Sequence, residues 1–130
     1  MPQKPPQNRR KPQPPGVDAG LVQHGLNGFK MPAIDTTDAA AVEARITEYL
    51  QQCVNDDCLP TVGGVANACG VSVREVQNWK AGQRGSKEHK RIICKFYAIL
   101  EDIWAQDLSA NRYEPRAGIY IGRNYYGYRD

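Results

Sequence analysis

The sequence lacks a run of apolar residues that approaches the roughly 20 needed to span a membrane. It also lacks a glycine-rich phosphate loop ending in Lys-Ser or Lys-Thr, because Gly63-Gly64 alone does not make one. No Ser-His-acid or Cys-His pattern with recognisable flanks is present. These absences argue against a membrane protein and against an enzyme, and we expect no cofactor.

Cysteine is present but is not arranged for metal binding. Four, ten and twenty-four residues separate Cys53, Cys58, Cys69 and Cys94, so the two close ligand pairs of a structural zinc site are missing. The start of the sequence has no apolar signal core, which argues against secretion and therefore against disulfides. We expect reduced thiols with a structural role, no bound metal and a cytosolic protein.

Positive charge is in small excess, with a formal net charge of +3, but it is unevenly distributed. Between residues 36 and 57 the acidic side chains outnumber the single Arg45, whereas residues 61–91 carry six basic side chains against Glu75 and Glu88. A basic block over a candidate DNA-reading element is expected where a protein contacts phosphates.

Residues 1–35 are predicted to form a flexible, proline-rich basic arm. Its first part carries Lys4, Arg9, Arg10 and Lys11 among six prolines, and several glycines follow. Such a composition buries too little apolar surface to offset the entropy of ordering. The arm could be a solubilising tail or could touch phosphates, and the sequence leaves both open.

The rest of the chain predicts an all-α fold, with a helical DNA-binding domain over 36–85 and a long helix and aromatic tail over 86–130. A first helix is expected from Thr37 to about Asn55, with Thr36 or Thr37 as its cap. Its apolar face comprises Val42, Ile46, Tyr49, Leu50 and Cys53, which recur at helical spacing.

The most specific local pattern predicts a helix-turn-helix at 61–80. Thr61 is placed to cap a short helix, and Gly70 suits the left-handed residue that ends it. Ser72 and Glu75 then form an S-x-x-E capping box at the start of a second helix that runs through Trp79.

The polar side of that second helix suits a groove of double-stranded DNA. Arginine can hold a guanine edge with two hydrogen bonds, glutamine or asparagine can do the same for adenine, and a helix N-terminus can meet a phosphate. The predicted DNA-binding residues are Ser72, Val73, Arg74, Gln77, Asn78, Lys80, Arg84, Lys87 and Arg91. A two-helix corner that serves only packing would show a similar pattern and remains an alternative.

A long helix is predicted from about Lys87 to Ser109, with Ser86 as its cap. Its apolar and aromatic stripe is wider than the first helix is expected to cover, which favours self-association over core packing alone. The predicted oligomerisation residues are Ile93, Phe96, Leu100, Ile103 and Trp104.

The end of the sequence carries a resemblance to a known family. An apolar stretch, Ile119-Tyr120-Ile121, leads to Arg123-Asn124, two tyrosines and Gly127-Tyr128-Arg129-Asp130. This order resembles a signature of the small terminase subunits of tailed bacteriophages, in which an apolar stretch precedes Lys-Asn, an aromatic residue and Gly-Tyr-Lys-Asp. The elements upstream, from Pro60 to Ala66, then Trp79, then a long helix, occur in a similar order.

The resemblance implies a role in packaging viral DNA in the cytoplasm of a host cell. Members of that family assemble into rings, bind the viral genome near the packaging start, and recruit and regulate the large terminase subunit. Double-stranded DNA, the large subunit and further copies of this chain are therefore the implied partners. A helix-turn-helix transcription regulator, usually a twofold dimer, is the main alternative, and a purely structural phage protein is a third.

Overall fold

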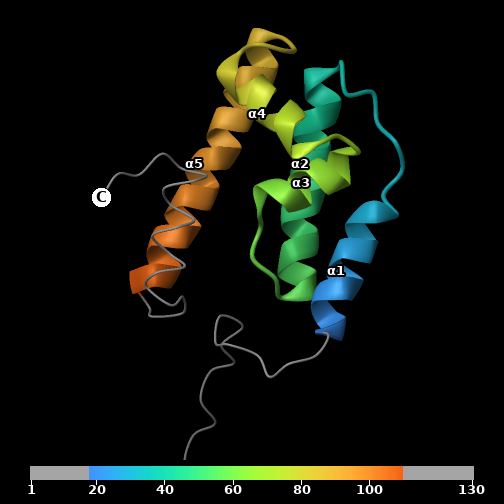
Figure 1. Ribbon diagram of the computed structural model, residues 1–130, viewed down its shortest axis with the longest axis vertical. Coiled ribbons are helices and arrows are strands. Elements are labelled where there is room, and N and C mark those ends of the chain that lie inside the picture. Colours follow the sequence, from blue (N-terminus) through green and yellow to red (C-terminus); the bar gives the residue numbers. More distant parts are fainter. Residues whose placement is uncertain (1–17, 110–130) are drawn as a thin grey trace, which may run out of the picture. The chain divides into compact units, whose positions relative to one another are not determined.

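The computed structural model describes residues 18–109, which form five α-helices (Figure 1). They are α1 (Ala19–Phe29), α2 (Ala39–Asp56), α3 (Val62–Cys69), α4 (Val73–Ala81) and α5 (Lys87–Ser109). No strand occurs within these residues, so the predicted all-α class is confirmed for them. The basic segment before residue 18 and the family-like segment 117–130 lie outside the described residues.

The chain divides into two compact units. One unit includes residues 18–100, which form α1 to α4 and the first part of α5. Of the other unit, the structure describes residues 101–109, which form the end of α5. The predicted boundary at residue 85 is therefore misplaced, because α5 packs its first turns onto the same core as α4. Within the described part of the chain, the helices are too short or too polar to cross a membrane.

Helix α1 occupies a segment that the sequence analysis assigned to the flexible arm. Asp18 caps it by accepting a hydrogen bond from the Leu21 amide at 3.2 Å. Its inner side packs on α3, where a Cβ on Gly28 would lie 2.8 Å from Nδ2 of Asn67. The prediction of a flexible arm is wrong over residues 18–35. The prolines nearby dominated the composition of residues 1–35 and hid an apolar helix. Its Gly28 allows close packing on α3 and is not a sign of flexibility.

Helix α2 begins two residues later than predicted. Asp38 is its N-cap and accepts a hydrogen bond from the Ala40 amide at 3.0 Å. The predicted cap at Thr36 or Thr37 is wrong, because Asp35 engages both the amide and the hydroxyl of Thr37, at 3.0 and 2.6 Å, and forms a turn before the helix.

Helices α2 and α3 cross at a point where no side chain fits between them. A Cβ on Gly64 would overlap the hydroxyl of Tyr49, which is buried on α2. That hydroxyl accepts a hydrogen bond from the Thr61 amide at 2.9 Å, and burial raises the pKa of Tyr49. The apolar core around this crossing comprises Val42, Ile46, Tyr49, Cys53, Val62, Val65, Ala66, Ala68 and Cys69.

The apolar stripe of α5 is covered within the chain itself. Ile93, Phe96 and Leu100 are each 1% exposed. A single chain thus offers no exposed surface at these three residues, and their role in oligomerisation stays a prediction. The sequence argument weighed α5 against α2 alone, whereas α4 and the loop before α2 also contact α5. Ile103 and Trp104 are half-buried in the second unit.

We predict that Gly64→Ala destabilises the fold by about 1–3 kcal/mol, because the added methyl overpacks the contact with Tyr49. Chemical unfolding followed by circular dichroism measures the change. Gly63→Ala is the matched control: it adds the same methyl to the same helix, where the nearest atom is 4.0 Å away. The control should be neutral or stabilising through helix propensity, and equal losses for the two variants would contradict the crossing.

Candidate nucleic-acid interface

Helices α3 and α4 are joined by a short turn whose two ends are capped. The Thr61 hydroxyl accepts a hydrogen bond from the Gly64 amide at 2.9 Å, and Gly70 ends α3 in the left-handed region with φ at 74°. The Ser72 hydroxyl then accepts a hydrogen bond from the Glu75 amide at 3.1 Å and starts α4. These features fix where α3 begins and ends and where α4 begins, as the sequence predicts.

The capping box is only half formed. Ser72 caps the amide of Glu75, but the Glu75 carboxylate lies 4.0 Å from Nε of Arg84 in the loop after α4. Glu75 therefore orients the loop as well as suiting the positive end of the helix dipole.

One face of α4 is buried and the opposite face is in solvent. Val76 and Trp79 belong to the core, whereas Arg74 and Gln77 are exposed. Val73 and Asn78 are half-buried, one at each edge of the exposed face. The structure thus brings together the predicted base-contacting residues, with Val73 as an apolar edge beside them.

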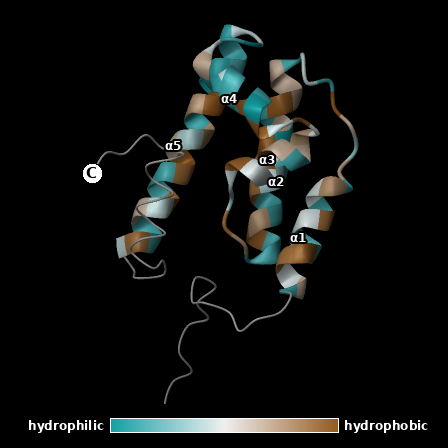
Figure 2. Ribbon diagram, viewed as in Figure 1, coloured by the Kyte–Doolittle hydropathy of each residue, from teal (hydrophilic) through white to brown (hydrophobic). Residues whose placement is uncertain are grey.

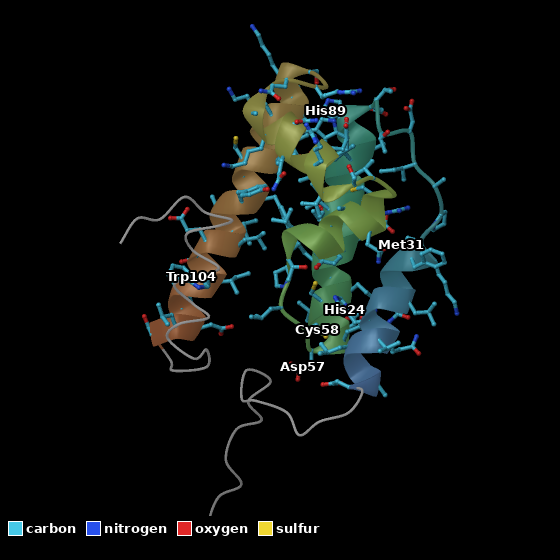
Figure 3. All side chains as sticks on the ribbon, viewed as in Figure 1. His24, Met31, Asp57, Cys58, His89 and Trp104 are labelled. Atoms are coloured by element: carbon cyan, nitrogen blue, oxygen red, sulfur yellow. The ribbon has the colours of Figure 1, made fainter. Side chains whose placement is uncertain are left out.

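His89 of α5 packs against the buried side of α4. Its ring lies 5.4 Å from that of Trp79 and is buried where α4, α5 and the start of α2 meet (Figure 3). Nδ1 accepts a hydrogen bond from the Ser86 amide at 3.0 Å, so Nε2 carries the hydrogen and donates to the Thr36 carbonyl at 2.9 Å. Both ring nitrogens are thus hydrogen-bonded to backbone groups, which fixes the ring against which Trp79 of α4 packs.

The basic side chains near α4 differ in what they already contact. Arg74 and Lys87 are exposed and have no ion-pair partner among residues 18–109. Arg91 instead donates to Glu88 at 2.9 Å and lies 3.8 Å from Glu43. The bond to Glu88 raises the pKa of Arg91 and holds its guanidinium on the protein. Arg91 is therefore the weakest of the predicted DNA contacts.

Two further cations lie beside the end of α4. Lys80 places its ammonium 4.7 Å from the centre of the Tyr97 ring, a cation–π contact that orients it. Lys90 was not predicted as a contact, yet its side chain packs on Gly82, where a Cβ would lie 3.3 Å from Cδ. The position of Lys90 three residues after Lys87 was the available signal, since residues at this spacing share a helix face.

The four cysteines were predicted to be reduced thiols with a structural role. None of the four cysteines forms a disulfide, and burial raises the pKa of the Cys69 thiol to about 11. Among residues 18–109 no group of three His, Cys, Asp or Glu side chains is placed to hold a metal ion.

A pocket of about 480 Å³ lies against the turn between α3 and α4. Its wall includes the loop after α1, the turn residues Gly70 and Val71, and Arg45. Arg45 is 4% exposed and donates to the carbonyls of Ala68 and Pro32, both at 2.5 Å. This arginine is thereby a structural clamp between the end of α3 and the loop after α1, and not a surface cation.

Comparison of the chain with protein-family models, with curated proteins and with solved structures finds no match.

We predict that Gly70→Ala lowers the free energy of unfolding by about 1–2 kcal/mol. No atom lies within 4 Å of the position that the new Cβ would take, so the cost is that of the left-handed conformation alone. Gly70→Asn should lose less, because asparagine tolerates this conformation. Thermal unfolding of both variants measures the difference; an alanine variant as stable as the parent would contradict the turn.

Proposed function

We propose that this protein binds double-stranded DNA and that α3 and α4 form a helix-turn-helix whose second helix enters the major groove. The observation that carries the proposal is the two-sided environment of α4. Trp79 is fixed in the core by its contact with His89, while Arg74 and Gln77 project from the opposite face. Their side-chain chemistry matches the edges of guanine and adenine.

Contacts to the DNA backbone would surround this reading face. The N-terminus of α4 at Ser72 can meet a phosphate, and Lys87 and Lys90 follow at the start of α5. Such contacts carry no sequence information but position the helix in the groove and make binding depend on salt.

The biological role is proposed from the sequence of the C-terminal segment 117–130. Its resemblance to small terminase subunits supports a packaging protein of the host cytoplasm that binds viral DNA as a ring and recruits the large terminase subunit, without catalysis of its own. A helix-turn-helix transcription regulator would use the same face of α4. The mass of the assembly formed on duplex DNA discriminates between them, since an assembly no larger than a dimer favours the regulator and a larger closed ring favours packaging.

We predict that Arg74→Ala weakens DNA binding about tenfold or more and relaxes base choice, as expected when a bidentate base contact is lost. Lys87→Ala should weaken binding to all sequences alike and reduce the salt slope by about one. Fluorescence anisotropy with a 30-base-pair duplex at several salt concentrations measures affinity, and enrichment from a random duplex pool measures base choice.

Arg91→Ala is the matched control for Arg74→Ala. Both variants remove one exposed arginine, but Arg91 is already held by two carboxylates. Its loss should change the dissociation constant less than about threefold. Equal effects of the two variants would show that α4 does not read bases, and no duplex binding even at low salt would leave a motif that serves only packing.

A further inference from the structure

Helix α1 has an apolar face that the described residues do not cover. Val22, Leu26 and Phe29 are 60%, 38% and 75% exposed. With Gly25 they occupy positions i, i+3, i+4 and i+7, the spacing of a face that is normally buried. Open space surrounds the position of a Cβ on Gly25, and the apolar colouring of α1 is visible in Figure 2.

The other face of the same helix is already used. His24 Nδ1 lies 2.6 Å from Asp56 of α2, which lowers the pKa of that carboxyl, and Asn67 of α3 donates to the Gly25 carbonyl at 3.0 Å. Packing on the chain's own core therefore explains the inner face of α1 and leaves the outer face unexplained.

Charge occurs only at the two ends of this helix. No Asp, Glu, Lys or Arg lies between Ala19 and Phe29, whereas Asp18 precedes the helix and Lys30 follows it. Both flanking side chains are exposed, and neither has an ion-pair partner among residues 18–109. The surface is thus negative at one end, apolar along its length and positive at the other end.

We propose that this surface binds α1 of a second copy of the chain, with the two helices antiparallel about a twofold axis. The axis passes near residue 24, so Asp18 faces Lys30 of the partner subunit and Val22 faces Leu26 of the partner subunit. Phe29 then lies over the small Ala19 of the partner subunit. Antiparallel pairing also sets the helix dipoles in opposite directions, and Gly25 permits close approach.

The size of the surface sets the strength of this contact. An 11-residue helix extends about 16 Å, so the interface is at the small end, below about 1,200 Å² in total. A contact of this size is expected to be reversible, so the dimer should depend on protein concentration. The pairing is independent of the proposed DNA binding, because it is measured without DNA and uses a different helix.

The first experiment is sedimentation equilibrium of the full chain over a range of concentrations. The parent should change from monomer to dimer, and Leu26→Lys should remain monomeric at concentrations at least tenfold higher. Val54→Lys is the control, because Val54 is an exposed apolar residue on another helix, α2; it should dimerise like the parent. Circular dichroism confirms that each variant is folded.

The second experiment tests the antiparallel register. Lys30→Asp places like charges at both ends of the pair, as does Asp18→Lys, and each variant alone should dimerise several-fold more weakly than the parent. An equimolar mixture of the two variants pairs opposite charges at both ends and should recover dimers. Loss of the Asp18 cap cannot produce this recovery.

Three results would overturn the proposal. They are a full chain that stays monomeric at every concentration, a Leu26→Lys variant that associates like Val54→Lys, and a mixture of charge variants that associates no better than its components.

Discussion

The position of α4 depends on the buried contact between Trp79 and His89. The imidazole accepts a hydrogen bond from the Ser86 amide at Nδ1 and donates one from Nε2 to the Thr36 carbonyl, so three separate segments meet at one ring. Gly85 approaches the same ring so closely that a Cβ would lie 2.8 Å from Cγ of His89. Because Trp79 packs against this ring, the opposite face of α4 is exposed to solvent.

The basic side chains around α4 differ in whether a carboxylate of the same chain already pairs with them. Glu43 and Glu88 occupy Arg91, and Glu75 lies within reach of Arg84. A carboxylate beside a cation competes with phosphate for it, so the number of basic residues overstates the charge that a nucleic acid would meet. Within residues 18–109 no carboxylate forms an ion pair with Arg74, and its neighbour Glu75 lies 4.0 Å from Nε of Arg84 instead.

The elements that depend on local signals could be predicted from the sequence. Gly70, Ser72 and Ser86 encode a helix end or a helix start within a few residues, and α3, α4 and α5 accordingly lie where they were expected. The interior of α5 could not be assigned, because its burial depends on which distant segments cover it. Helix α1 was missed for a different reason: its glycines resemble those of a linker until Asn67 is seen packed against Gly28.

The candidate site shows the same difference between local sequence signals and contacts between distant segments. The outward residues of α4 follow from helical spacing, whereas the pairing of Arg91 with Glu43 requires two helices to be placed side by side. Lys90 could have been found from its spacing to Lys87, whereas its contact with Gly82, eight residues earlier across a loop, could not. Spacing along one helix predicts a face, but it does not predict which cations on that face are already neutralised.

The Arg45 clamp has a mechanical consequence. By holding the Ala68 and Pro32 carbonyls together, it joins the segment that follows α1 to the turn that precedes α4. The outer face of α1 and the polar face of α4 are therefore parts of one compact unit. If copies associate through α1 as proposed, the fold of this unit sets the separation of their α4 helices.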